Sequence, residues 1–473
     1  MRHLNLFILS IFISSSLVQA QGTDIQYKAS NRLLYRLADK NKEESFDNWL
    51  DVDYTLDNFL TGLRVELHQP SNPTNSVESI SQRYFQFHKD WLKIRVGNFY
   101  KRLGKGLIFQ AFEMQNIALD RIQQSFVVDR NVDGLLMEIS SDLLDINLLS
   151  GKPLWTKSDI VRGGELQCHP YDWALLGGSY LRINSNDNQG QFKTELASGQ
   201  VGLSLSNIEV YVEYAKKRVP SDKFLKNGKA LYLSSNIYGS NFGLSFEYKD
   251  YRDFAQPLNN PPTLVKQHFL TLLNRHTHTI FADDEIGFQI ETVFTPWTST
   301  SFIANLSRSG NHDGDELYKF QEIYSEVKQE IVEKFAARFV YDQSFDRLVG
   351  DKDRKTSALE LDYFIDKHNS LLLDIQVQRV EKSTGNLKYN NQLFLLAYSR
   401  SPFLTIGFQY EHTTDNSSDR KEWLAGTLNI KLGQSHDLFV TYGQRRAGLV
   451  CSGGYCQLVP EFKGLELRLN SRF

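Results

Sequence analysis

The chain has little of several features that mark common classes of protein. Its 473 residues include three cysteines and eleven prolines, and its formal net charge is only −3. A charge so close to zero argues against the basic surface by which proteins bind nucleic acid. After the first twenty residues, no segment approaches the roughly 18 unbroken apolar residues that a transmembrane helix needs. The scarcity of proline leaves room for long, uninterrupted strands.

The first twenty residues predict export from the cytoplasm. A positively charged start precedes an apolar run from Leu4 to Ile13, and the small residue Ala20 ends a typical cleavage site. We therefore expect residues 1–20 to be a signal peptide that is removed. Residues 21–473 would then form the mature domain.

Apolar and polar residues alternate along most of the remaining chain. Segments 371–378, 404–411 and 424–432 place leucine, isoleucine and valine opposite aspartate, glutamine and threonine. This period of two predicts strands with one apolar and one polar face. Tight turns alternate with long polar connections, and 22 tyrosines and 31 phenylalanines suit the aromatic girdles of membrane barrels. The strands of a soluble β-sandwich also alternate apolar and polar residues, but a sandwich rarely contains one uninterrupted meander of this length.

The pattern therefore predicts an all-β fold, a transmembrane antiparallel β-barrel. The number of strands comes to about 24, within a range of roughly 18–24. Two connections are too long to be ordinary turns, Glu113–Asp133 and Phe254–Asp284. Long loops of this kind usually carry function, and in a wide barrel we expect them to fold into the lumen.

The last ten residues show the alternation most clearly. Leu465, Leu467 and Leu469 share one face and the phase of Phe473, while the residues between them are polar or charged. This strand resembles the closing strand of bacterial outer-membrane β-barrels, whose terminal phenylalanine is recognised by the assembly machinery. The resemblance implies that Phe473 binds that machinery as a partner.

Two longer stretches, residues 96–107 continuing to 129–134 and residues 445–473, together resemble an uncharacterised, porin-like family of outer-membrane barrels. The resemblance covers the whole mature chain and implies the fold and an outer-membrane location, with outer-membrane lipid around the barrel. It implies no substrate, because that family has none established.

Basic residues gather near the first long loop and are candidates for lining a pore. Those at alternate positions along the strand share one face, which should point into the lumen. A ring of positive charge there would attract anions. The alternative is that they pair with luminal acids and hold the strands and the loop together. The candidates are Lys93, Arg95, Lys101, Arg102, Lys105, Arg121 and Arg130. The acids considered as their partners are Glu66, Glu113, Asp129 and Asp133.

Other motifs offer weaker chemistry. Gly104 and Gly106 flank Lys105, but the Walker spacing is absent, so the glycines indicate a bulge or a bend into the lumen. Cys451 and Cys456 can close a small disulfide loop, which leaves a third cysteine, Cys168, unpaired.

A cluster of histidines and acids in the second long loop could coordinate a metal or could be an ordinary polar loop. We predict no metal and no cofactor. The members of this cluster are Arg275, His276, His278, Asp283, Asp284 and Glu285.

The sequence favours an outer-membrane channel or transporter for a small polar or charged solute, with no chemical step. The alternative is a plugged barrel that serves as a scaffold for surface attachment or secretion machinery. An outer-membrane enzyme has less support, because no Gly-x-Ser-x-Gly elbow or recognisable triad is present.

Overall fold

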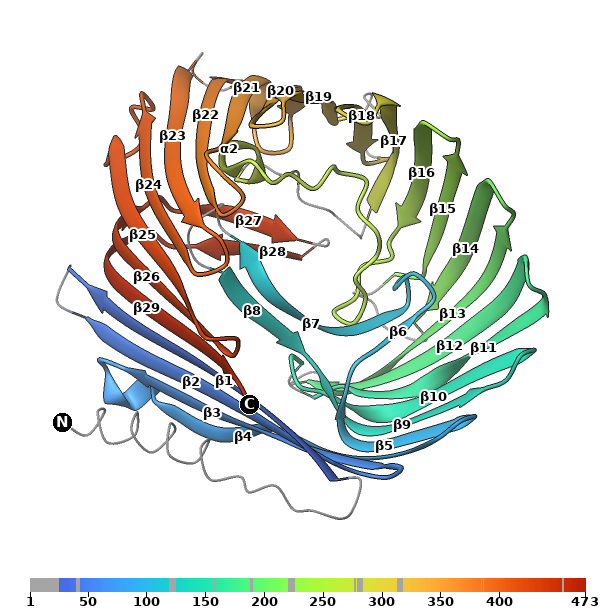
Figure 1. Cartoon of the computed structure of the whole chain (residues 1–473). Coiled ribbons are helices and arrows are strands. Elements are labelled where there is room, and N and C mark those ends of the chain that lie inside the picture. Colours follow the sequence, from blue (N-terminus) through green and yellow to red (C-terminus); the bar gives the residue numbers. More distant parts are fainter. Residues whose placement is uncertain are drawn as a thin grey trace.

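Strands make up almost all of the computed structural model, and 24 of them close into a barrel (Figure 1). The structure describes residues 25–39, 43–118, 125–156, 158–187, 190–219, 226–275, 278, 284–312, 318–383, 385, 387–452 and 455–473. The expected signal peptide lies outside the described residues.

Each barrel strand pairs antiparallel with the next, except where insertions intervene. There β5 (Leu92–Phe99) pairs with β9 (Val132–Ser140), and β26 (His436–Arg445) pairs with β29 (Phe462–Arg472). The remaining barrel strands are β1 (Ile25–Ala38), β2 (Glu44–Leu56), β3 (Phe59–Pro70), β4 (Val77–Lys89), β10 (Leu144–Pro153), β11 (Ile160–Tyr171), β12 (Ala174–Asp187), β13 (Gly190–Ser204), β14 (Ile208–Arg218), β15 (Gly228–Tyr238), β16 (Phe242–Arg252), β17 (Asp284–Trp297), β18 (Thr300–Gly310), β19 (Phe320–Val332), β20 (Phe335–Asp346), β21 (Asp351–Phe364), β22 (Asn369–Lys382), β23 (Lys388–Arg400), β24 (Leu404–Thr413) and β25 (Glu422–Leu432).

The two ends of the chain close the ring. β1 pairs with β29, and the backbone groups of Ala29 and Phe473 exchange two hydrogen bonds of 3.1 and 2.8 Å. A closed ring leaves no strand edge with unpaired backbone groups, which a lipid environment would penalise. The prediction of about 24 antiparallel strands is confirmed.

The two faces of the wall have opposite polarity. On β22, Asp374, Gln376 and Gln378 are 0% exposed, whereas Ile375 and Val377 are 37% and 45% exposed. The polar face thus lies inside the barrel and the apolar face outside, the reverse of a soluble sandwich. An apolar exterior around a polar interior is the pattern of a barrel that spans a membrane. This confirms the transmembrane fold expected from the alternation.

Exposed aromatic side chains surround the rim that the short turns form. Trp91, Trp297 and Phe403 lie at three of these turns, and at a fourth Tyr171 stacks on Trp173 with ring centroids 5.1 Å apart. Amphipathic rings of this kind occupy the boundary between lipid and water. They therefore mark one edge of the membrane-facing band.

Local hydrogen bonds fix the tight turns. Between β21 and β22, the backbone amides of His368 and Asn369 donate to Asp366 Oδ1 over 2.7 and 2.9 Å. These bonds, that of His368 first, hold the pKa of the Asp366 carboxyl below its usual range. Aspartate is common in turns because its side chain can accept hydrogen bonds from the backbone of the residues that follow, as Asp366 does here.

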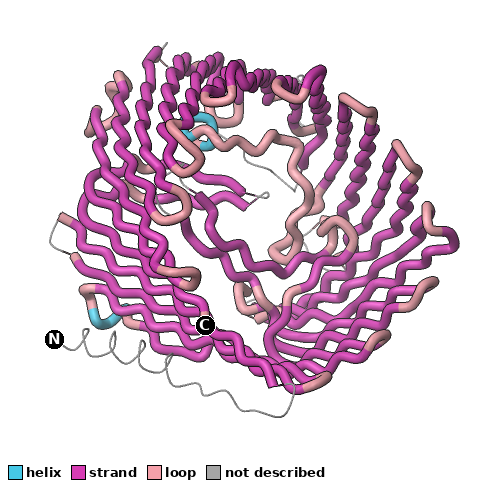
Figure 2. The backbone as a smooth tube through the Cα atoms, viewed as in Figure 1, coloured by secondary structure: helices cyan, strands magenta, loops and turns pink. Residues whose placement is uncertain are grey.

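Three insertions leave the other rim, where the long connections lie, and enter the barrel (Figures 1 and 2). The first covers residues 100–131 and contains β6 (Lys101–Leu103), β7 (Phe109–Ala118) and β8 (Ser125–Arg130). The second covers residues 253–283 and contains the short helix α2 (Thr271–Asn274). The third covers residues 446–461 and contains the hairpin of β27 (Gly448–Ser452) and β28 (Tyr455–Val459).

These insertions confirm part of the expectation and correct part of it. The described parts of the two predicted long loops do enter the barrel. The first begins at Tyr100, well before the expected Glu113, because the wall strand β5 ends at Phe99. Residues 447–460 had the composition of an external connection, yet they form a hairpin inside the ring.

In the part of the chain that the structure describes, helix is confined to two short pieces. Besides α2, a 3-10 turn, η1 (Pro73–Asn75), lies in the connection between β3 and β4. Within the described residues, no helix combines the length and the apolar character needed to cross a membrane.

Candidate functional site in the lumen

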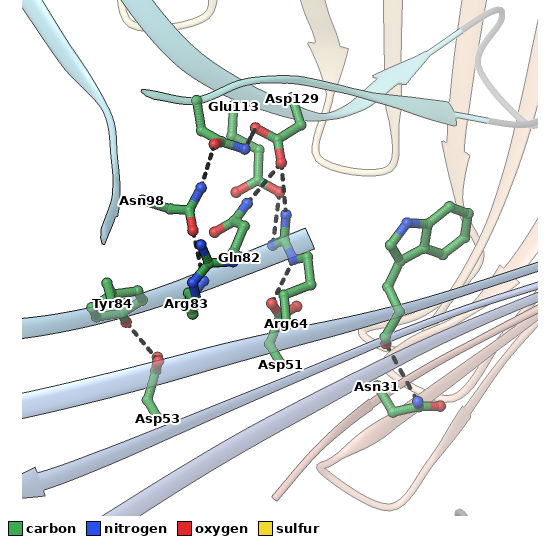
Figure 3. Close-up of polar contacts among 12 residues, drawn as sticks. Asn31, Asp51, Asp53, Arg64, Gln82, Arg83, Tyr84, Asn98, Glu113 and Asp129 are labelled. Atoms are coloured by element: carbon green, nitrogen blue, oxygen red, sulfur yellow. Dashed lines mark hydrogen bonds and ion pairs between the residues drawn. The ribbon is translucent and has the colours of Figure 1, made fainter. Parts of the chain in front are cut away.

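One arginine of the wall binds two acids of the first insertion. Arg64 projects inward from β3, and its Nε lies 2.6 Å from Asp51 of the neighbouring wall strand (Figure 3). Its two terminal nitrogens lie 3.0 Å from Glu113 and 3.3 Å from Asp129, both on the insertion. Because the guanidinium group is planar and has five donors, it can bind all three carboxylates at once.

Asp129 also links the two ends of the first insertion through hydrogen bonds. Its Oδ1 accepts hydrogen bonds from Tyr100 Oη over 2.9 Å and from Asn131 Nδ2 over 2.9 Å. The side chain of Asn131 in turn accepts a 2.7 Å bond from Asn98 on the wall. The insertion therefore leaves and rejoins the wall at one connected polar network.

The glycine-rich bend of the insertion binds two carboxylates of the wall, one on β11 and one on β14. The backbone N–H of Gly104 donates to Glu165 over 2.7 Å, and that of Lys105 donates to Glu213 over 2.8 Å. A Cβ atom on Gly104, whose φ is +53°, would lie 2.5 Å from Glu213 Oε2. The bend therefore requires glycine for close approach and a left-handed conformation.

A polar pocket of about 280 Å³ lies beside this bend. The ammonium group of Lys105 lies 5.0 Å from the centre of the Tyr211 ring, and both residues line the pocket. His169, Glu209 and Ser234 of the wall also contribute to its lining. Such a mixture of one cation, an acid and neutral donors suits a small polar ligand.

Two of the predicted basic residues share one acid. Lys93 Nζ and Lys101 Nζ each lie 2.6 Å from a different oxygen of Glu138, on β9. Lys93 belongs to the wall and Lys101 to the insertion, so the carboxylate bridges the two. The Arg95 guanidinium instead lies over the Tyr84 ring, 3.5 Å from its centre.

The other basic candidates differ in environment. Arg130 lies over the rings of Phe112 and Trp155, at 5.6 and 6.0 Å from their centres. Arg102 is exposed. Arg121 lies outside the described residues.

Three of the acids considered from the sequence bind arginines that were not among the candidates. Glu113 and Asp129 bind Arg64, and Asp133 binds Arg83 over 3.2 Å. The lysines are bridged by Glu138, which was not among the candidates. Its position on the polar face of a strand was the available signal, but the register between β5 and β9 had to be known to select it.

The first and second insertions share an apolar core. Leu103 and Phe109 of the first pack with Phe254 and Leu258 of the second, all essentially unexposed. The backbone N–H of Gln110 donates to the carbonyl of Leu258 over 2.9 Å. The same core includes Leu136, Val161 and Tyr251 of the wall, so the two insertions pack on each other and on the wall.

The second insertion runs along the inner wall and bonds to one strand after another. Its contacts are Lys266 to Glu291 over 2.6 Å, His268 to Glu322 over 2.9 Å, the Leu272 N–H to Gln376 over 3.0 Å, and Arg275 to Glu411.

The histidine and acid cluster expected near residue 276 is brought together only in part: His278 Nε2 lies 3.8 Å from Glu285. His278 bonds to Asp346 over 2.6 Å and to Ser309 over 3.0 Å. Asp284 instead accepts a 3.0 Å bond from the backbone N–H of His312. His276 and Asp283 lie outside the described residues.

The third insertion meets the second at a common acid. Arg446 Nη1 lies 3.1 Å from Glu411, which also binds Arg275, and 3.0 Å from Asn391. The backbone register places Cys451 directly opposite Cys456. Their side chains lie outside the described part of the chain, so the disulfide stays a prediction.

Together these observations define a transmembrane β-barrel whose lumen contains its own chain, anchored by buried ion pairs. The chain belongs to a family of unknown function (DUF6029), which matches residues 3–473. No curated protein matches it.

Solved structures with similar folds include the following two. One is the translocation pore of the P pilus usher PapC, with 10% identity, 95% of this chain and 99% of that chain covered, and a TM-score of 0.48. The other is the siderophore receptor PirA from Pseudomonas aeruginosa, with 8% identity, 96% of this chain and 81% of that chain covered, and a TM-score of 0.47.

Proposed function

We propose that this protein is a gated transporter of the outer membrane, which passes a small polar or charged solute without a chemical step. A barrel of this strand number is too wide for wall side chains to fill, and barrels of similar size have plugged lumens. The polar inner wall suits a hydrated solute. The insertions supply the gate.

The observation that carries this proposal is the way in which the first insertion is fastened. Arg64 and Glu138 join the insertion to the wall through ion pairs, which can exchange partners without a covalent step. A plug held in this way can move and return. Ion pairs would also make its release sensitive to the charge of an arriving solute.

A reversible cross-link tests the proposal. Gln82 of the wall and Asp129 of the insertion are hydrogen-bonded over 2.7 Å, so Gln82→Cys with Asp129→Cys, in a Cys168→Ser background, allows a short thiol cross-linker to lock the plug. The control joins Ser399→Cys to Thr405→Cys, which pair between two wall strands. We expect only the first cross-link to abolish flux of charged solutes into proteoliposomes.

The ion selectivity of the barrel provides a second test of the proposal. Neutralising the candidate pore-lining residues Lys93, Arg95 and Lys101 should shift ion selectivity toward cations, because positive charge near the path attracts anions. A folded barrel that gives neither flux nor discrete conductance, locked or unlocked, would contradict the transport proposal.

The fully buried core between the first two insertions favours a second candidate, a permanently plugged scaffold for surface attachment or secretion machinery. On this view, breaking the Arg64 contacts would leave conductance absent. Stoichiometric partners would instead copurify with the barrel from membranes.

A further inference from the structure

A histidine from the second insertion meets two acids of the wall in a fully enclosed site. His268 is 6% exposed, Glu322 on β19 is 1% exposed and Asp342 on β20 is 0% exposed. One donor atom from each side chain lies within 4.8 Å of the others. Two carboxylates and an imidazole in one enclosed place are costly without a compensating charge.

Within the described residues, not every nitrogen and oxygen atom of these three side chains is hydrogen-bonded. His268 Nε2 bonds to Glu322 Oε1 over 2.9 Å, and Ser344 donates a long 3.4 Å bond to Asp342 Oδ1. In the described part of the chain, His268 Nδ1, Glu322 Oε2 and Asp342 Oδ2 have no hydrogen-bond partner. Buried carboxylate oxygens without a partner are rare, and a bound cation is one of the recognised reasons for them.

The nearest cationic side chains are directed elsewhere. Lys266 Nζ lies 2.6 Å from Glu291, and Arg354 Nη1 lies 3.2 Å from Asp351. These two ion pairs are with acids outside the site. The two carboxylates therefore keep lone pairs free for a ligand.

We propose that His268, Glu322 and Asp342 bind one divalent transition-metal cation and thereby fasten the second insertion to two wall strands. Imidazole with carboxylate suits Zn²⁺ or Mn²⁺, whereas Ca²⁺ and Mg²⁺ prefer oxygen ligands alone. Bonds of about 2.0–2.2 Å put two ligands of one ion at most about 4.4 Å apart. The present 4.8 Å spread thus needs only small side-chain adjustments.

The surroundings suit such a site. The ring of Tyr324 lies 5.3 Å from that of His268, and Leu270, Val340 and Ala358 belong to the same buried cluster as Tyr324. An apolar shell lowers the local dielectric and strengthens the attraction between cation and carboxylate. Binding requires neither an open lumen nor flux, so the proposal is independent of the transport function.

Metal content of the purified, untagged barrel tests the inference. After treatment with a chelator and dialysis against Zn²⁺, the wild type should retain one equivalent more zinc than Asp342→Asn. The control is His278→Gln, which changes another buried histidine bonded to an acid, Asp346. It should retain as much zinc as the wild type.

Co²⁺ gives an answer that depends on no variant. Bound through nitrogen and oxygen, it should show visible d–d absorption in the wild type that Zn²⁺ abolishes. Absence of this absorption, or equal zinc in the wild type and a folded Asp342→Asn, would overturn the proposal. The cluster would then be an ion pair that only positions the insertion.

Discussion

Replacing Arg64 by alanine should weaken the attachment of the first insertion to the wall. The Arg64 side chain is 9% exposed, and the carboxylates of Asp51, Glu113 and Asp129 are 33%, 18% and 20% exposed. Breaking a buried ion pair costs about 3–5 kcal/mol, whereas an exposed pair contributes about 0–1 kcal/mol. Because the acids are partly hydrated, we expect a loss of about 2–3 kcal/mol.

This loss acts on the equilibrium between the attached and the detached insertion. Each 1.4 kcal/mol is about a factor of ten, so the detached population should rise roughly 30- to 150-fold. Hydrogen exchange of β7 and β8 in detergent measures this directly, since exchange through local opening follows the open population. Peptides from the wall strand β22 should exchange as in the wild type.

Two variants separate this effect from general damage. Arg83→Ala removes a neighbouring ion pair whose side chains are 66% and 33% exposed, and exchange in β7 and β8 should change less than about fivefold. Arg64→Lys keeps the positive charge but loses the planar guanidinium group that binds several carboxylates at once. The increase in exchange of β7 and β8 should therefore be intermediate. Equal exchange in Arg64→Ala and Arg83→Ala would refute the role given to Arg64.

Three further predictions concern other parts of the chain. Gly104→Ala should lower stability by about 1–3 kcal/mol, seen as a lower midpoint of thermal unfolding, because its Cβ would meet Glu213; Gly243→Ala, with no atom within 4 Å of the new Cβ, should not. Phe473→Ala should reduce the amount of barrel in outer-membrane fractions without changing synthesis, and an unchanged amount would argue against recognition of the terminal residue. The peptide that contains Cys451 and Cys456 should gain two hydrogens in mass on reduction; an identical mass before and after would exclude the disulfide.

Much of the wall could be predicted from the sequence. Strands such as β22 and β29 alternate over most of their length because one face meets lipid and the other the lumen, and that requirement acts on each residue separately. Asp366 likewise specifies its turn through bonds to the next residues. Such local constraints can be recognised without knowing which strands are neighbours.

The contents of the lumen could not be predicted in the same way. Lys101 was placed on a wall strand, but it lies on β6 because the chain leaves the wall after Phe99. The hairpin of β27 and β28 has the composition of an external loop, and only its packing inside the ring distinguishes it. A polar segment is equally compatible with water outside the cell and with a polar lumen.

The sequence alone determined the alternation, the approximate strand number and the closing strand, since each follows from residues adjacent in the chain. Only the tertiary structure decided which charges meet. Arg64 with Glu113, Lys93 with Glu138, and His268 with Glu322 are brought together by strand register and by the paths of the insertions. Ion pairs form between groups a few ångströms apart in space, and separation along the chain does not reveal that distance.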